Sequence, residues 1–373
     1  MSSSNCHYLS IELFSEKFRI ISDFEKVIEF FEILYPVSKR INSINGNFHD
    51  FKIEVDSKNE HSYTIIYDDN SIKIDSEKYL ITNVYLNFMK FFPTKVKNFF
   101  LFHGAAFFHN NKGSIIVGPP GYGKSTLSLA LKFEGLNLLS DELGAICYKD
   151  NKLYPYNKLT TLRQDSLRFF PTLSSFQAEF ILMDDTKKYL VRNENKVMDD
   201  KKGFDLHNVF ILSNPNQEKH KSNVSHLILE KFDENVLQKL ENIDDFKLIK
   251  IDKRKKYPVI YFDSKAIFET KNNIQLLCKK NGIQILSMES ARFSKPDFKR
   301  EPQLIEIQKT TGISELCEYM KGGLNSGIAK YTFKENVFEI FVHLMKTFNN
   351  TKFFYLYPGE LKQTTKLMLE MLS

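Results

Sequence analysis

The stretch GPPGYGKST, residues 118–126, constrains the fold more than any other part of this chain. Gly118, Gly123, Lys124 and Ser125 satisfy the pattern G-x-x-x-x-G-K-[S/T], with the apolar run SIIV before it and the periodic run STLSLALKF after it. Such a loop joins a buried strand to a helix, and its glycines let backbone N–H groups approach phosphate oxygens. The sequence therefore predicts an α/β fold with a P-loop nucleotide-binding core.

The loop residues have distinct expected roles. The N-terminus of the helix adds partial positive charge. The Lys124 ammonium would reach the β- and γ-phosphates, and the Ser125 hydroxyl would take one Mg²⁺ position. The residues expected to bind the nucleotide are Gly118, Gly121, Gly123, Lys124, Ser125 and Thr126.

Two carboxylates follow the loop. Asp141 and Glu142 come after the buried run LNLLS, which reads as the strand after the loop's helix. We expect them at the edge of a parallel sheet, where open α/β folds assemble their sites. One carboxylate would anchor Mg²⁺ and the other would accept the proton of an attacking hydroxyl. An acidic turn, or an aspartate that only holds metal in an ATPase, stays open as an alternative.

Other polar side chains frame the loop. His103 ends the predicted strand FFLFH just before Gly104. A lone histidine at a strand end is more often structural, so its position ahead of the loop is the argument for a role. Lys158 and Arg163 fall in the next strand–loop unit, where cations would stabilise a transferring phosphoryl group. The alternative for both is a basic side chain that faces solvent.

The order of these elements resembles a known family. His103-Gly104, a hairpin, the glycine loop, a helix ending at Gly135 and then LLSDE together resemble the catalytic domain of HPr kinase/phosphorylase and its relatives. The nucleotide site of that family is similar to that of phosphoenolpyruvate carboxykinase. LLSDE and HGAA are more similar to the related kinases, some of which accompany peptide natural-product genes and phosphorylate a serine hydroxyl. The specific resemblance covers roughly residues 100–145.

The resemblance implies an ATP- and Mg²⁺-dependent kinase whose acceptor is a hydroxyl, foremost a serine of a peptide or small protein. It implies that Lys124 and Ser125 bind phosphate and Mg²⁺, and that Asp141 is the general base. Glu142 would assist with metal or phosphate, and His103 would line the site. The metal ligands would then be Ser125, Asp141 and Glu142.

The chain also departs from the family. HPr kinases carry a downstream Glu-Arg-Gly signature, whereas TTLRQDSLRF contains Arg163 without the preceding glutamate or the following glycine. This difference argues against phosphorylase activity and against HPr as the substrate. Two rival functions stay open: a kinase of a free amino acid or sugar, and a nucleotide-binding regulator that does not transfer phosphate. The family forms ring-like oligomers, which leaves a homo-oligomer open here.

We predict two parts in the chain: a smaller N-terminal α/β module, residues 1–96, and a catalytic domain, residues 97–373. An insertion is expected at about 247–310, where YPVIYF and the helical run KNNIQLLCKKNG precede an exposed loop, ARFSKPDFKREPQ. The basic run KLIKIDKRKK could hold an acidic partner. At the C-terminus, FFYLYPGELKQTTKLMLEMLS predicts a strand, a turn and a helix.

Apolar spacing in the N-terminal module predicts two helices, residues 24–36 and 78–92, each ended by a proline. Between them, DFKIEV, SYTIIYD and NSIKID predict a small antiparallel sheet.

The composition of the chain limits the partners and the cellular compartment that we expect. The charge of +6 arises from 52 basic and 46 acidic side chains spread along the chain, which favours a solvated surface over nucleic-acid binding. We expect no membrane span, because no apolar window reaches the ~18 residues that one needs. The four cysteines are far apart, which fits a reducing cytoplasm.

Overall fold

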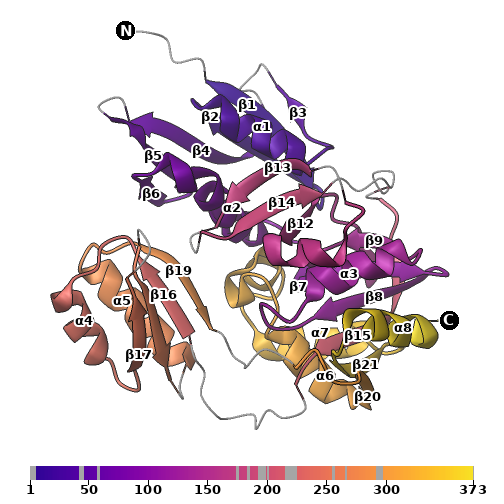
Figure 1. Ribbon diagram of the computed structural model, residues 1–373. Coiled ribbons are helices and arrows are strands. Elements are labelled where there is room, and N and C mark those ends of the chain that lie inside the picture. Colours follow the sequence, from indigo (N-terminus) through magenta and orange to yellow (C-terminus); the bar gives the residue numbers. More distant parts are fainter. Residues whose placement is uncertain are drawn as a thin grey trace.

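The computed structural model shows a mixed α/β fold with several sheets (Figure 1). Within the described residues, no helix has both the length and the apolar character needed to cross a membrane. The structure describes residues 6–41, 46–56, 59–173, 176–182, 185–191, 199, 201–214, 225–253, 257–264, 267–290 and 297–372.

The N-terminal part forms a six-stranded sheet in the order β3-β1-β2-β4-β5-β6. Helices α1 and α2 pack apolar side chains into the same core as this sheet. Both helices were predicted from the sequence, and the structure confirms them. The elements are β1 (His7–Leu13), β2 (Glu16–Ser22), α1 (Glu25–Leu34), β3 (Lys39–Arg40), β4 (His49–Asp56), β5 (Asn59–Tyr67), β6 (Asn70–Ile74), and α2 (Leu80–Phe91), which is flanked by short 3₁₀ turns η1 (Glu77–Tyr79) and η2 (Phe92–Thr94).

The antiparallel sheet predicted for the N-terminal part contains only some of the strands that this sheet has in the structure. Strands β4, β5 and β6 are antiparallel, but β4 also pairs in parallel with β2, which forms a hairpin with β1. The hairpin turn is Phe14-Ser15, and both residues have left-handed φ angles, 54° and 66°. Such tight turns favour Asn-Gly or Asp-Gly. The usual turn signal is therefore missing from the sequence.

The central sheet has the order β11-β10-β7-β8-β15-β21-β20, and β9 also pairs with β7. Among the described strands of this sheet, only β8, β15 and β21 are mutually parallel, so the expected parallel sheet is in fact mixed. The expected hairpin of β7 and β8, with its tight turn at Asn110-Asn111, supplies one antiparallel pair. Remote strands supply others, because β10 pairs antiparallel with β7 and β20 with β21. The strands are β7 (Phe99–His109), β8 (Lys112–Val117), β9 (Asn137–Ser140), β10 (Leu143–Cys147), β11 (Lys152–Tyr154), β15 (Phe204–Leu212), β20 (Gln303–Ile307) and β21 (Lys352–Tyr357).

Helices cover both faces of the central sheet, because apolar side chains alternate along its buried strands. On one face, α3 and α8 pack against Phe107 and Phe210. On the other, α6 and α7 pack against Phe102 and Val209. These elements are α3 (Lys124–Phe133), α6 (Lys309–Cys317), α7 (Val337–Thr347) and α8 (Leu361–Leu372), with the 3₁₀ turn η4 (Gly323–Asn325) and the π-helix η5 (Ile328–Thr332) between α6 and α7.

The N-terminal part and the central sheet share a hydrophobic core. Leu101 of β7 and Leu143 of β10 belong to the same buried cluster as the side chains of α1 and α2. A three-stranded sheet in the order β12-β14-β13 adds Phe180 and Leu190 to this cluster. Its elements are β12 (Thr160–Arg163), β13 (Phe176–Ile181) and β14 (Lys187–Val191), with the 3₁₀ helix η3 (Gln164–Phe169) after β12.

A further four-stranded sheet, β17-β18-β16-β19, has a core of its own with α4 and α5 (Figure 1). It begins before the predicted insertion at 247–310, because β16 pairs with β18 and β19, and β20 belongs to the central sheet. Residues 254–256 of the basic run and 291–296 of the predicted loop lie outside the described residues. The elements are β16 (Ser225–Leu229), α4 (Glu234–Glu241), β17 (Lys247–Asp252), β18 (Val259–Asp263), α5 (Ile267–Lys280) and β19 (Ile285–Ser290).

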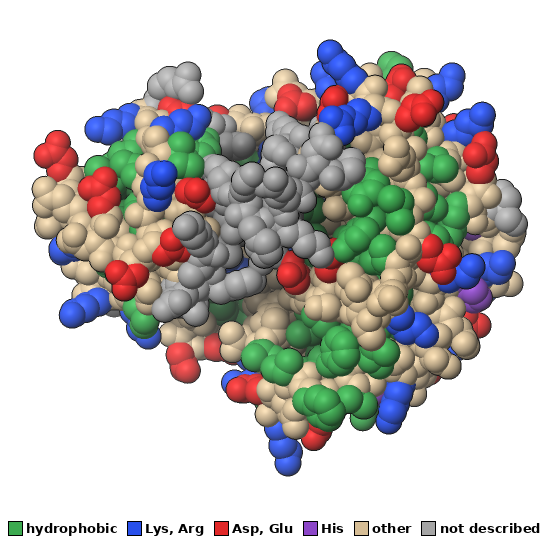
Figure 2. Space-filling model, turned by 90° about the horizontal axis from the view of Figure 1, so that it is seen from below, with side chains coloured by type: hydrophobic (Ala, Val, Ile, Leu, Met, Phe, Trp, Pro, Cys, Tyr) green, Lys and Arg blue, Asp and Glu red, His purple; other side chains and the backbone are tan. Residues whose placement is uncertain are grey.

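Surface charge is mixed on the face seen from below. Figure 2 shows basic and acidic side chains scattered over that face, with apolar side chains gathered between them.

Candidate functional site

The glycine loop joins the end of β8 to the start of α3, as predicted. Gly118 lies so close to β15 that a Cβ there would come within 2.6 Å of Leu212 Cβ. Gly123 has a left-handed φ of 86° at the N-cap of α3, a conformation that side chains with a Cβ rarely adopt. The backbone of the loop therefore requires glycine at both positions.

The Lys124 side chain is buried inside this loop. Its Nζ donates hydrogen bonds to the carbonyl oxygens of Gly118, at 2.6 Å, and Pro119, at 3.1 Å. Ser125 is partly exposed in the first turn of α3. The Thr126 hydroxyl donates to Ser166 Oγ at 3.1 Å, so this side chain engages η3.

The carboxylates Asp141 and Glu142 directly follow the end of β9, as expected, and β10 begins immediately after them. Both strands pair antiparallel with β7, so the two residues interrupt one long strand. The Gly104 N–H donates to the Glu142 carbonyl at 3.0 Å, and Gly104 pairs on its other side with Val117, the last residue of β8. The acidic pair and the start of the glycine loop are thus two strand spacings apart, about 10 Å.

Lys158 forms ion pairs with both carboxylates. Its Nζ lies 3.4 Å from Asp141 Oδ1 and 3.2 Å from Glu142 Oε2, and its side chain is 0% exposed. Asp141 Oδ2 accepts the Thr161 N–H at 2.9 Å, and Glu142 accepts the hydroxyl of Tyr85 from α2. Burial excludes the solvent-facing alternative for Lys158.

The electrostatics of the cluster favour the charged form of Glu142. Burial alone would raise the pKa of Glu142, but the ammonium groups of Lys158, Lys321 and Lys188 hold it well below its usual range. Burial would likewise lower the pKa of Lys158, yet Asp141 and Glu142 raise it above its ordinary value. Glu142 and Lys158 therefore stay ionised at neutral pH.

His103 is neutral in this setting. Burial, reinforced by the charges of Lys321 and Lys124, holds its pKa well below 6.5, while Glu142 opposes the shift. Its Nδ1 is buried and has no hydrogen-bond partner in the structure. The imidazole thus lies within electrostatic range of the loop lysine and the acidic pair.

Several charged groups of the cluster were not singled out from the sequence as site residues. Lys188 comes from β14, and burial together with Lys158 and Arg163 lowers its pKa although Glu142 opposes this. Lys321 follows Met320, which forms a bridge with Phe102 of β7. No motif marks either residue, because each reaches the site only through tertiary pairing. Arg163 itself is exposed at the end of β12.

The cluster therefore carries more positive than negative charge. The two carboxylates and the neutral imidazole lie within electrostatic range of Lys124, Lys158, Lys188 and Lys321, and Arg163 acts on Lys188. Excess positive charge beside a helix N-terminus suits a polyphosphate anion.

A metal ion fits this site only together with such an anion. In the described parts of the chain, no group of three or more His, Cys, Asp or Glu side chains could hold a metal ion. Mg²⁺ on a nucleotide usually takes one or two carboxylates, since phosphate oxygens and water complete its shell. Asp141 Oδ1 is buried without a hydrogen bond but lies 3.4 Å from the Lys158 ammonium, so a metal ion bound there would share this oxygen with Lys158.

Comparison with known proteins adds no assignment: no protein-family model matches the chain, and neither does any curated protein.

The buried His103 predicts a stability that depends on pH. Because its pKa is lower in the native state, the unfolded chain binds this proton more readily, and the stability is fully present only above about pH 6.5. It should fall as the pH drops below 6.5, and Glu142 should add a second loss below about pH 4.5. Urea unfolding at several pH values measures both. The substitution His103→Gln should flatten the upper part of the profile; an unchanged profile would contradict a buried neutral imidazole.

Proposed function

We propose that this chain is a kinase that binds ATP and Mg²⁺ at the glycine loop and transfers the γ-phosphate to a serine hydroxyl of a peptide or small protein. One observation carries the proposal. The loop that buries Lys124 and the pair Asp141–Glu142 lie within about two strand spacings on the same sheet. Cations in excess surround them, as a transferring phosphoryl group requires.

We further propose that the core is a P-loop nucleotide site of the kind found in HPr-kinase-related kinases and phosphoenolpyruvate carboxykinase. The support is the order of the parts: His103 in β7, the glycine loop after β8, and the acidic pair after β9. Asp-Glu in place of Asp-Asp favours the related kinases over HPr kinase itself.

Each residue has a role in this proposal. Lys124 exchanges the carbonyls of Gly118 and Pro119 for β- and γ-phosphate oxygens, and the loop N–H groups bind the remaining oxygens. Ser125 and the acidic pair would hold Mg²⁺, which neutralises phosphate charge when bound. Asp141 orients the acceptor hydroxyl and takes its proton.

The strength of Asp141 as a base matters little in this reaction. The transition state of phosphoryl transfer is loose, and catalysis comes chiefly from positioning and charge stabilisation. Lys158 and Thr161 fix the orientation of the Asp141 carboxylate. His103, being neutral, can donate or accept one hydrogen bond at the phosphate side of the site.

A second candidate function has an observation of its own. Asp141 is only 4% exposed and is engaged by Lys158 and Thr161, which favours a carboxylate that supports structure. The chain would then be a nucleotide-binding regulator that transfers no phosphate. Both candidates require ATP binding at the loop, and only the kinase labels a hydroxyl.

The substitution Lys124→Ala tests ATP binding at the glycine loop, which both candidate functions require. Losing a charge-assisted hydrogen bond to phosphate should weaken ATP binding by about 10- to 100-fold, measured by titration calorimetry with Mg²⁺ present. Lys112→Ala, exposed at the other end of β8, is the matched control and should bind ATP like the wild type. Equal affinity in the Lys124 variant and the wild type would remove the loop from both proposals.

A further inference from the structure

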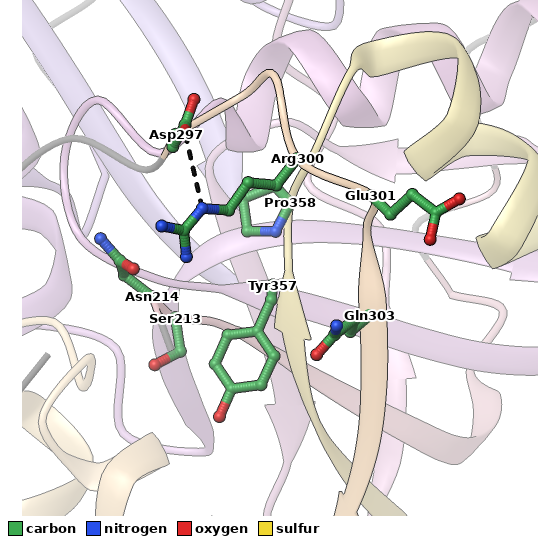
Figure 3. A pocket seen from close by; sticks show the side chains of 8 residues that line it. All are labelled: Ser213, Asn214, Asp297, Arg300, Glu301, Gln303, Tyr357 and Pro358. Atoms are coloured by element: carbon green, nitrogen blue, oxygen red, sulfur yellow. Dashed lines mark ion pairs between the residues drawn. The ribbon is translucent and has the colours of Figure 1, made fainter. Parts of the chain in front are cut away.

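A pocket of about 390 Å³ lies at the carboxyl ends of β15 and β21 (Figure 3). Ser213 directly follows β15, Tyr357 ends β21, and Gln303 begins the neighbouring β20. Since β8, β15 and β21 are parallel, the pocket and the glycine loop open at the same sheet edge. Ligands of open α/β sheets bind at such edges.

Two contacts connect this pocket to the glycine loop. Gly118 packs against Leu212, the residue before Ser213, and a Cβ on Gly123 would lie 3.9 Å from Phe298 Cε1. Phe298 belongs to the turn from Asp297 to Arg300, whose two ends line the pocket. A ligand at the loop could therefore extend into the pocket without leaving the protein surface.

The pocket and the acidic pair lie on opposite sides of the loop. Along the central sheet, Asp141 and Glu142 lie between β9 and β10, which pair with β7 on one side of β8, while β15 and β21 lie on the other side. In the proposed reaction, the γ-phosphate faces the acidic pair, where the acceptor must sit. The other end of the nucleotide then leaves the loop toward the pocket.

The chemistry of the lining suits a nucleoside. Neutral groups predominate: the hydroxyls of Ser213 and Tyr357 and the amides of Asn214 and Gln303. Asn and Gln amides match the donor–acceptor pattern of a base edge, and an aromatic ring offers a stacking surface. The Arg300 guanidinium is paired with Asp297 at 3.4 Å, so its charge is partly compensated.

The directions of the side chains agree with this chemistry. In Figure 3, Arg300, Asn214, Ser213 and Tyr357 surround a common space, whereas the Glu301 side chain points away from it. The volume lies at the lower end of the ~300–1,000 Å³ that small-molecule sites occupy, which fits a nucleoside whose phosphates sit outside the pocket.

We propose that this pocket binds the nucleoside part of the nucleotide whose phosphates occupy the glycine loop. The inference rests on the proposed nucleotide binding and extends it: it assigns Tyr357 to stacking on the base, and Gln303 and Asn214 to hydrogen bonds with the base edge. These residues set the preference for a nucleoside triphosphate over an inorganic polyphosphate.

The test compares two probes, ATP and inorganic tripolyphosphate, by calorimetry with Mg²⁺ present. Wild type should bind ATP more tightly. Tyr357→Ala should weaken ATP binding about 5- to 100-fold and leave tripolyphosphate binding unchanged, because only ATP has a base to stack. Gln303→Ala should do the same to a smaller extent. Glu306→Ala, at an exposed position further along β20 and outside the pocket lining, is the matched control and should bind both probes like the wild type.

The outcomes distinguish a failure of the nucleoside assignment from a failure of the proposed nucleotide binding at the glycine loop. Tripolyphosphate binding that persists in the Tyr357 variant shows that the variant is folded. Equal wild-type affinity for the two probes would overturn the nucleoside assignment but would leave phosphate binding by the glycine loop unaffected. The nucleoside assignment would also be overturned if the Tyr357 and Gln303 variants bound ATP like the wild type, or if they lost affinity for ATP and tripolyphosphate equally. Wild type that binds neither probe would overturn nucleotide binding itself.

Discussion

Replacing Asp141 by asparagine is expected to lower phosphoryl transfer by about 10²- to 10⁴-fold, the usual contribution of a positioned acid or base. The substitution keeps the size of the side chain and an oxygen for the Thr161 N–H, which Asp141 Oδ2 accepts at 2.9 Å. It removes the charge and the ability to take a proton from the acceptor. ATP binding should persist, since Lys124 and the loop backbone carry it.

The assay follows label from γ-labelled ATP to the acceptor, with ATP affinity measured on the same preparation. Asp150→Asn, in the exposed turn after β10, is the matched control and should transfer at the wild-type rate. Wild-type transfer by the Asp141 variant would show that the base is assigned wrongly. Loss of ATP binding along with transfer would assign Asp141 to the nucleotide rather than to the acceptor.

Replacing Lys158 by methionine should lower the free energy of unfolding by about 3–5 kcal/mol at neutral pH, because two buried carboxylates lose the ammonium that lies within 3.4 Å of both. The three side chains are 0–13% exposed, so water can compensate little. The loss should shrink at acid pH, where protonation of Glu142 in the variant removes the unpaired charge. Urea denaturation monitored by circular dichroism measures both effects.

A neighbouring exposed lysine provides the control. Lys187 of β14 pairs with Glu179 at 2.7 Å, and both side chains are more than 40% exposed. Such surface pairs contribute at most about 1 kcal/mol, so Lys187→Met should change stability little. If Lys158→Met were as mild as this control, the buried ion-pair cluster would not have the energetic role assigned to it.

Local signals in the sequence were sufficient for much of the fold. Helical periodicity correctly predicted α1, α2, α3 and α8, and the turn residues correctly separated β7 from β8. The β1–β2 hairpin was missed because Phe14-Ser15 occupies a turn that glycine or asparagine normally marks. The mixed direction of the central sheet was missed because pairing between remote strands leaves no local signal.

The residues of the candidate site also fall into two groups: those that local sequence signals indicate and those that only the folded structure brings together. The glycine loop, His103 and the acidic pair are close in sequence, so their order could be recognised and their meeting expected. Lys188, Lys321 and the Tyr85 hydroxyl reach the cluster from β14, from the segment after α6 and from α2. Their positions depend on tertiary packing. The burial of Lys158 between two carboxylates likewise has no signature in sequence.

The most direct test of the central claim is label transfer by the wild-type chain. The protein is incubated with γ-labelled ATP, Mg²⁺ and peptides encoded by neighbouring genes, and mass spectrometry locates any phosphate gained. The account predicts a phosphoserine on one peptide, which is absent when Asp141→Asn replaces the wild type. Tight ATP binding by the wild type, with no labelled hydroxyl on any peptide, would contradict the kinase and favour the regulator.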